Sequence, residues 1–159
     1  MSLKYKILIT GVAGFLGSHL AETLSKLGHH VIGIDNMMGG YADNISKDIE
    51  FYELDCCNLS EVQEKMKGVD IVYHCAATAH EGLSVFSPYE ITKNNYLASV
   101  SIFTAAINNK VKRIVYCSSM ARYGNSKTPF TEDMDPNPID PYAISKVASE
   151  KVLANLCDI

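Results

Sequence analysis

Apolar segments of strand length alternate with helical patterns along the chain, and this alternation constrains the fold more than any other feature. The strand-like segments cover residues 5–10, 30–35, 49–55, 69–76 and 113–119, and the helical patterns cover 15–27, 59–68, 89–109 and 142–157. Nearly continuous apolar strands separated by helices are typical of a parallel sheet covered on both faces. We therefore expect a doubly wound α/β fold with strand order 3-2-1-4-5 and right-handed crossovers.

The composition is that of a folded protein and argues against several functional classes. A length of 159 residues fits one domain over 1–159, and 47% hydrophobic with 20% charged residues is typical of a globular chain. The net charge of −4, without a block of lysine or arginine, argues against a nucleic-acid partner. Neither a membrane-span pattern nor a signal-peptide pattern is found, so we expect a cytoplasmic protein without a membrane partner.

The cysteines are odd in number and show no metal-binding spacing. They are Cys56, Cys57, Cys75, Cys117 and Cys157. Several follow apolar strand-like runs, where small buried residues are common. Because no CxxC pair exists, we expect neither a metal site nor a redox site, and we expect reduced thiols.

A glycine-rich stretch, TGVAGFLG, lies between the first strand and the first helix. Its spacing is that of a dinucleotide-binding loop, and the required strand and helix flank it. Gly11 permits a tight turn, Gly14 lets the backbone approach a pyrophosphate, and Gly17 lets helix and strand pack closely. The free amides at the start of the helix would then meet the phosphate charge.

An acidic residue ends the second strand, as such a loop requires. Asp35 lies 18 residues beyond Gly17. A carboxylate there can accept both hydroxyls of an adenosine ribose and would repel a 2′-phosphate. The residues that follow, NMMGG, supply no arginine to hold such a phosphate, so the sequence favours NAD over NADP. The alternative is that Asp35 is only a turn residue.

Two further polar residues allow more than one interpretation. Asp55 ends the third strand and is either a contact to the adenine amino group or a turn acid before the next helix, for which we expect Ser60 as the cap. His74 lies in an apolar strand, where a packed, hydrogen-bonded histidine is more frequent than a catalytic base. The small residues Ala76 and Ala77 would let a cofactor lie close to the chain.

Tyr142 and Lys146 stand four residues apart at the start of the last helix, so both lie on one helix face. The pair is either a surface contact or a phenol whose ionised form is favoured by a neighbouring ammonium. Residues 120–141 before it are rich in Pro, Asp and Asn and resemble a loop. A loop of that length inside a compact domain is usually functional.

Taken together and in this order, the motifs resemble those of the extended short-chain dehydrogenase/reductase family, particularly its NAD-dependent nucleotide-sugar epimerases of the UDP-glucose 4-epimerase type. The matching motifs are Thr10-Gly11-x-x-Gly14-Phe15-Leu16-Gly17, Asp35-Asn36, Asp55, His74-x-Ala76-Ala77, Asn94-Asn95, Ser118-Ser119, Tyr123-Gly124 and Tyr142-x-x-x-Lys146. They run from end to end of the chain, so the resemblance covers all of it.

The resemblance implies a Rossmann-like fold and an enzyme that abstracts hydride reversibly from a sugar carbon of a nucleotide-sugar substrate. It implies Tyr142 as the base, Ser119 as a hydrogen-bond donor to the reacting oxygen, and Lys146 as the residue that grips the nicotinamide ribose. The NAD-binding residues that we expect are Gly11, Gly14, Phe15, Leu16, Gly17, Asp35, Asn36, Asp55, Cys56, Cys75, Ala76, Ala77, Tyr142 and Lys146. Asn95 would match an asparagine that ties helix to sheet.

Two departures from the family pattern bear on the reaction. Family dehydratases carry Thr-Asp-Glu where this chain has Ser119-Met120-Ala121, so we do not expect elimination of water. Arg122 replaces a small apolar residue and is either a solvated loop charge or a contact to a substrate phosphate. The alternative functions are an NAD-binding sensor, an inactive fragment of the same fold, and a nucleotide-sugar reductase or dehydrogenase.

The family's substrate-binding C-terminal region follows the helix of Tyr142, and this chain ends at Ile159. We therefore expect the N-terminal portion of the family fold, without turnover by itself. Relatives of the family pair the helices that correspond to 89–109 and 142–157, so we also expect a homodimer. The apolar residues that support it are Ile91, Leu97, Val100, Phe103, Ile107, Ile144, Val147 and Leu156.

Overall fold

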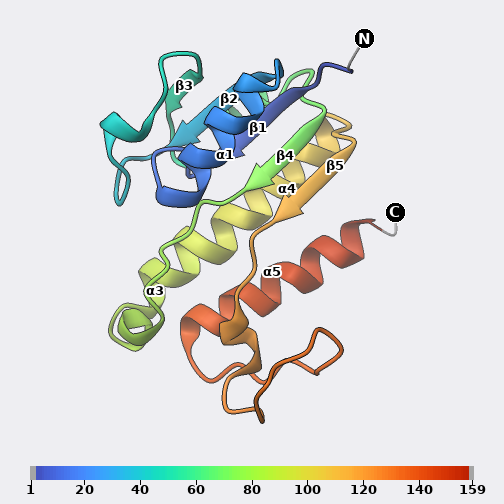
Figure 1. Ribbon diagram of the computed structural model, residues 1–159. Helices are drawn as coiled ribbons and strands as arrows, with labels where there is room; N and C mark the ends of the chain where they lie inside the picture. Colours follow the sequence, from blue (N-terminus) through green and yellow to red (C-terminus); the bar gives the residue numbers. More distant parts are fainter. Residues whose placement is uncertain (1–2, 158–159) are drawn as a thin grey trace.

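A five-stranded parallel sheet forms the centre of the molecule (Figure 1) in a computed structural model that describes residues 3–157. Its strands are β1 (Lys6–Thr10), β2 (His30–Asp35), β3 (Glu50–Glu53), β4 (Ile71–His74) and β5 (Arg113–Tyr116). They are ordered β3-β2-β1-β4-β5, and each neighbouring pair is parallel. The predicted doubly wound topology is confirmed.

Helices cover both faces of this sheet. They are α1 (Phe15–Lys26), α2 (Leu59–Lys65), α3 (Pro88–Ile91), the π-helical segment η3 (Thr92–Leu97), α4 (Ala98–Asn108) and α5 (Pro141–Cys157). Short 3-10 turns complete the chain: η1 (Ala42–Asn44), η2 (Glu81–Phe86) and η4 (Met120–Tyr123). None of the helices between residues 3 and 157 has both the length and the apolar character needed to cross a membrane.

Alternation along β1 divides the core into two layers. Ile7 and Ile9 point to the face that α1 covers, where they pack with Ala21. Leu8 points to the opposite face and joins a larger cluster that includes Phe103 of α4. Figure 1 shows α1 in front of β1 and β2, α4 behind β4 and β5, and α5 next to α4, below the tip of β5 in this view. The sheet is therefore buried on both faces at its middle strand, which explains why the three central residues of β1, Ile7, Leu8 and Ile9, are all apolar.

The strands are shorter than the apolar runs predicted. The fourth was expected to reach Ala76 but ends at His74, because the Ala76 amide donates to the Thr10 hydroxyl at 3.0 Å instead of continuing the ladder. The third and fifth strands likewise end at Glu53 and Tyr116. The apolar residues beyond these ends remain buried or half-buried at the edge of the sheet, so their pattern did not mark the strand ends.

Two helix predictions need correction. Ser60 is not the cap of α2, because the helix begins at Leu59 and the Asn58 side chain accepts from the Glu61 amide. The long helix predicted over 89–109 is interrupted by the π-helical segment η3, which hydrophobic spacing did not reveal.

The surplus of apolar residues on the two dimer helices is smaller than expected. Ile91, Phe103 and Val147 are buried in the core of this chain, so they leave no surface for a partner. Leu97, Ile107 and Ile144 are exposed, at 52%, 47% and 54%. Val100 and Leu156 are half-buried, so three of the eight predicted residues present an exposed apolar side chain to a partner.

The predicted loop over 120–141 is confirmed apart from the turn η4 and from Pro141, which is the first residue of α5. Gly124 has φ +49°, and a Cβ there would lie 2.0 Å from the Asn137 carbonyl oxygen, so glycine is required. The Tyr123 ring stacks on Phe130 with centroids 5.1 Å apart. Ala121 of η4 packs with Tyr142 and Ala143, and this contact holds the loop against the start of α5.

Candidate active site

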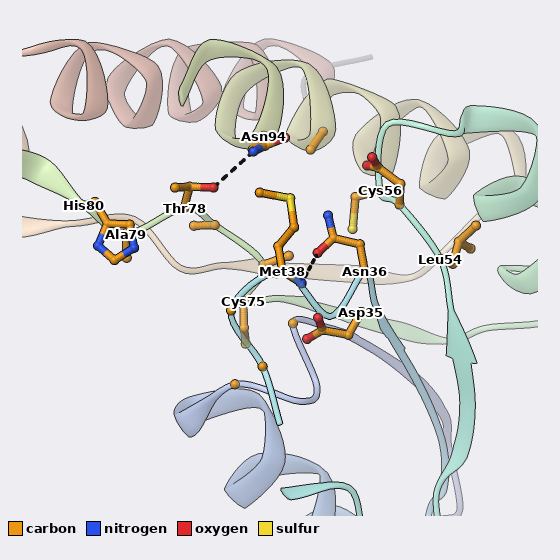
Figure 2. A pocket seen from close by; sticks show the side chains of 18 residues that line it. Asp35, Asn36, Met38, Leu54, Cys56, Cys75, Thr78, Ala79, His80 and Asn94 are labelled. Carbon is orange, nitrogen blue, oxygen red and sulfur yellow. Dashed lines mark hydrogen bonds between the residues drawn. The ribbon is translucent and has the colours of Figure 1, made fainter. Parts of the chain in front are cut away.

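A cavity of about 420 Å³ lies at the carboxyl ends of the parallel strands (Figure 2), where open α/β sheets bind ligands. Its lining comes from the loops after β1, β2, β3 and β4 and from the long helix. The lining residues are Gly11, Gly14, Asp35, Asn36, Met38, Gly39, Gly40, Leu54, Asp55, Cys56, Cys75, Ala76, Ala77, Thr78, Ala79, His80, Asn94 and Ala98.

The glycine loop has the close contacts that its spacing predicted. Gly11 has φ +70°, and a Cβ there would lie 2.8 Å from the Ala76 amide nitrogen. A Cβ on Gly17 would lie 2.2 Å from the Gly11 carbonyl oxygen. Gly14 is the N-cap of α1 and has no side chain to cap it, so the first amides of the helix have no partner within the helix. The loop therefore offers backbone donors to an anion.

Asp35 is fixed in the cavity wall by two backbone donors. Its Oδ2 accepts from the Ala13 amide at 3.0 Å, and its Oδ1 accepts from the Met37 amide at 2.9 Å. Only 8% of the residue is exposed. A carboxylate has about four acceptor positions, so two remain for a ligand. The turn role and the ligand-binding role of Asp35 are therefore compatible.

Asp55 also combines the two roles that its sequence position left open. Its Oδ1 accepts from the Cys57 amide at 2.8 Å, as a turn acid does, and the residue also lines the cavity. Burial raises the pKa of the neighbouring Cys56 to about 12. That thiol is therefore a neutral apolar part of the wall.

His74 is a packed, hydrogen-bonded residue, as its position in an apolar strand predicted. It is 1% exposed, and burial lowers its pKa to about 3. Ser99 Oγ donates to the Asn95 carbonyl oxygen at 2.5 Å and lies 2.9 Å from His74 Nε2. The proton of Ser99 is thus engaged, so Nε2 carries the imidazole proton and Nδ1 accepts from the Thr10 hydroxyl at 2.7 Å.

The π-helical segment directs two successive asparagines to the same loop. Asn95 accepts from the Thr78 amide at 2.7 Å and donates to the Thr78 carbonyl at 3.3 Å. Asn94 donates to the Thr78 hydroxyl at 3.2 Å and lines the cavity, as Figure 2 shows. Asn95 therefore ties the long helix to the chain that follows β4, as the resemblance implied.

Tyr142 and Lys146 lie together at the start of α5, and both are buried. Lys146 Nζ lies 5.7 Å from the centroid of the Tyr142 ring and donates to the Cys117 carbonyl oxygen at 2.9 Å. Burial lowers the pKa of Lys146 to about 8. Ser119 lies just beyond β5, where its Oγ accepts from the Ala121 amide at 3.1 Å. The hydroxyl proton of Ser119 stays available for donation.

The structure does not bring all predicted site residues to the cavity wall. Six of them do not line it: Phe15, Leu16, Gly17, Ser119, Tyr142 and Lys146. The side chains of Phe15 and Leu16 are exposed, so only their backbone is suited to a ligand.

Sequence reasoning missed several residues that do line the cavity. They are Met38, Gly39, Gly40, Leu54, Thr78, Ala79, His80 and Ala98. The pair Gly39-Gly40 could have indicated a close approach of the backbone to another element. The structure shows such an approach, because a Cβ on Gly40 would lie 2.5 Å from the Ala13 Cβ. The loop 78–80 carried none, since its place depends on its bonds to the distant asparagines.

Arg122 is neither a freely solvated charge nor a residue of the cavity wall. Its Nη2 lies 3.3 Å from Glu150 Oε2 of α5, and its carbonyl accepts from the Asn137 amide at 2.8 Å. Ser118 donates to the other carboxylate oxygen of Glu150. These contacts fasten the loop after β5 to α5. Across residues 3–157, no three His, Cys, Asp or Glu side chains gather as metal ligands would.

The fold and this site define a doubly wound α/β protein with a dinucleotide-type glycine loop and a Tyr-Lys pair beside the carboxyl edge of its sheet. The chain belongs to the NAD dependent epimerase/dehydratase family, which its residues 7–158 match.

Several curated relatives are similar along nearly the whole chain. The UDP-glucose 4-epimerase of Lactobacillus helveticus is 34% identical over 152 residues, which are 94% of this chain and 46% of that protein. The UDP-N-acetyl-alpha-D-glucosaminuronate decarboxylase of Bacillus cytotoxicus is 33% identical over 136 residues, 84% of this chain and 42% of that protein. The chain thus spans about half the length of the curated relatives it matches.

Solved structures show the same relation. A UDP-glucose 4-epimerase from Thermotoga maritima, solved with UDP-glucose, superposes with a TM-score of 0.93 at 32% identity, over 96% of this chain and 51% of that one. A UDP-glucose 4-epimerase from Brucella ovis, solved with NAD, gives 0.92 at 31% identity, over 97% of this chain and 48% of that one.

Proposed function

We propose that this chain forms the NAD-binding and proton-transfer half of a nucleotide-sugar epimerase. The observation that carries the proposal is the cavity itself, in which the glycine turn and the Asp35 carboxylate face one space. Gly11 and Gly14 would hold the pyrophosphate at the start of α1, and Asp35 would hold the adenosine ribose through its two remaining acceptor positions. Asp55 and Cys56 would border the adenine.

The residues at the end of β5 and the start of α5 would handle the proton. NAD, when bound, supplies the acceptor for hydride from the sugar carbon and returns that hydride. Tyr142 takes the hydroxyl proton of the substrate, assisted by the Lys146 ammonium, which the Cys117 carbonyl holds in place. Ser119 donates a hydrogen bond to the same oxygen as it gains carbonyl character.

Epimerisation is favoured over elimination of water because Met120 and Ala121 offer neither an acid nor a base after Ser119. The relatives described above include 4-epimerases and a decarboxylase, each named for a UDP-linked sugar. A UDP-linked sugar is therefore the proposed substrate class.

The Asp35 contact is tested by titrating NAD and NADP into the chain and its Asp35→Asn and Asp35→Ala variants. Asp35→Asn keeps the size of the side chain but loses its charge, so NAD should bind more weakly and the gap between NAD and NADP should narrow. Asp48→Ala, at an exposed position, is the matched control. An unchanged preference in both Asp35 variants would show that Asp35 is only a turn residue.

The proton-transfer proposal needs a separate measurement. With NAD and a UDP-sugar present, reduced cofactor is followed by absorbance in the wild-type chain and in Tyr142→Phe. Reduction of NAD in the presence of the wild-type chain, but not in the presence of Tyr142→Phe, would support the proposal. NAD binding without any hydride transfer would instead support the alternative of a binding module or an inactive fragment.

A further inference from the structure

Cys75 and Cys117 form a close thiol pair on neighbouring strands. They follow β4 and β5 one residue beyond the last register pair, His74 with Tyr116. The Cys117 amide donates to the His74 carbonyl at 3.1 Å, so the two strands are still joined at this level. The two sulfur atoms lie 3.7 Å apart and share a hydrogen bond. The sequence separates these residues by 42 positions and gave no sign of the pair.

The pair is accessible, unlike the buried thiol nearby. Cys75 lines the cavity, and both residues are only half-buried. Cys75 packs against the core cluster on the α1 face of the sheet, and the Cys117 sulfur lies beside it. Figure 1 shows α1 over β1 and β2, whereas no described helix covers β4 and β5 on that face. Cys56 is buried, and the Cys57 thiol donates to the Lys93 carbonyl. Within residues 3–157, these two cysteines are therefore the pair suited to joint chemistry.

The geometry meets the requirements for a covalent bond between the sulfurs. Adjacent strands lie about 4.7–4.9 Å apart, inside the usual Cα–Cα range of about 4.4–6.8 Å for a disulfide. The sulfurs need to approach from 3.7 Å to about 2.05 Å, which side-chain rotation can supply. Residues at the ends of the strands, beyond the regular ladder, allow that adjustment.

We propose that Cys75 and Cys117 form an oxidation site, at which a hydroperoxide converts the two thiols into an intramolecular disulfide. The thiolate of Cys117 attacks the peroxide oxygen, the O–O bond breaks, and a sulfenic acid forms as hydroxide leaves. The Cys75 thiol then attacks that sulfur, the S–O bond breaks and water leaves. The two thiols lose two electrons and two protons in total, and hydrogen peroxide becomes two molecules of water.

Two neighbouring groups favour Cys117 as the first nucleophile. The hydrogen bond with Cys75 and the positive charge of Lys146 lower the pKa of Cys117 below its ordinary value. The Lys146 ammonium is held nearby by its bond to the Cys117 carbonyl. Thiolates close to a lysine are the ones that peroxides oxidise preferentially.

The test uses the chain with Cys157→Ser, which removes the exposed cysteine near the end of α5. After treatment with hydrogen peroxide, intact mass should fall by two hydrogens, and peptide mapping should show one Cys75–Cys117 link that a thiol reductant reverses. Adding Cys75→Ser or Cys117→Ser should abolish the link, whereas adding Cys57→Ser should leave it unchanged. Thiols that stay reduced, separate sulfinic acids, or a link to another cysteine would each overturn the proposal.

A second experiment links the oxidation site to the proposed function. Unlike the first experiment, it rests on the proposed position of NAD. Because Cys75 lines the proposed NAD cavity, saturating NAD should slow formation of the disulfide. If the disulfide forms at the same rate with and without NAD, the oxidation site stands and the position proposed for NAD fails. If no disulfide forms in either case, the oxidation site fails and the NAD proposal is judged by its own titration.

Discussion

His74 shows how a buried polar residue joins parts of the chain that are far apart in sequence. Its ring bridges the Thr10 hydroxyl, beside the glycine turn, and the Ser99 hydroxyl of α4. The Thr10 oxygen in turn accepts from the Ala76 amide. One neutral tautomer therefore satisfies a donor and acceptor chain that runs from the cavity wall to the long helix. Its role is positional, because a neutral ring so enclosed has no path to a substrate.

The first prediction concerns acid stability. The pKa of His74 in the folded chain is about 3, below its ordinary 6.5, so the unfolded chain binds more protons between these values. The stabilising contribution is complete above pH 6.5 and is lost as the pH falls. We expect His74→Leu to make the free energy of unfolding less dependent on pH below 6.5 than in the wild type.

Urea unfolding at several pH values measures this effect. At neutral pH, His74→Leu should also lower the free energy of unfolding by about 1–3 kcal/mol, because two buried hydroxyls lose a partner. His19→Leu, at an exposed position, is the control and should keep the pH profile of the wild type. A wild-type profile in His74→Leu would show that His74 is charged or solvent-accessible in the native state.

At the scale of elements, the contact between α1 and the glycine turn is the tightest feature of the site. The helix can begin so close to β1 only because Gly17 carries no Cβ. Alanine is better than glycine by about 1 kcal/mol in a helix interior, so propensity alone would favour replacement. The steric contact with Gly11 opposes that preference and decides whether the substitution raises or lowers the free energy of unfolding.

We therefore predict that Gly17→Ala destabilises the fold and weakens NAD binding. The new Cβ would lie 2.2 Å from the Gly11 carbonyl oxygen, so the helix must shift away from the turn. A loss of about 1–3 kcal/mol is typical of such overpacking. Denaturant unfolding and an NAD titration measure both effects. Gly82→Ala, where a Cβ meets nothing within 4 Å, should change neither quantity.

Strands, helices and turns could be predicted from the sequence where hydrophobic periodicity or the spacing of residues determines them. The strand order, the helices and the glycine turn followed from apolar runs, helical spacing and the position of Asp35. The strand ends and the segment η3 did not, because hydrogen bonds between distant residues decide them. The thiol pair was missed for the same reason, since only strand pairing brings Cys75 to Cys117.

At the scale of the whole molecule, the segment η3 and the helices α4 and α5 leave apolar residues on the surface. Leu97, Ile107 and Ile144 are about half exposed. We propose that a second copy of the chain covers this face, as the family resemblance suggests. The buried members of these helices serve the core and carry no part of the proposal.

Sedimentation at high protein concentration tests this association. The wild-type chain should form a dimer, and Ile144→Glu combined with Leu97→Glu should give a monomer, because a carboxylate in an apolar interface is strongly unfavourable. Leu27→Glu, at an exposed apolar residue at the end of α1, should leave the dimer intact. A wild-type monomer at high concentration would remove the basis of the proposal.

The final prediction concerns turnover. The chain spans about half the length of its relatives, and the described residues of this structure provide the groups for proton transfer but no enclosing wall for a sugar. Exclusion of water and orientation of the substrate contribute many powers of ten to rate. Residues 1–159 alone should bind NAD weakly and, apart from the single hydride transfer to bound NAD proposed above, should show no epimerase turnover with common UDP-sugars. Steady turnover would mean that partner chains or the loop over 120–141 complete the site.

The π-helical segment η3 also has a consequence for how this helix is compared with those of other proteins. A wider turn accommodates one residue more than an α-helical turn, so it behaves as a single-residue insertion that leaves no loop. Deleting that extra residue would restore a regular α-helical turn and leave the residues on either side of it on their present faces. A sequence alignment that ignores this insertion would align Asn94 with the residue of the other protein that is equivalent to Asn95. It would then assign the role of an anchoring residue to a residue that lines the cavity.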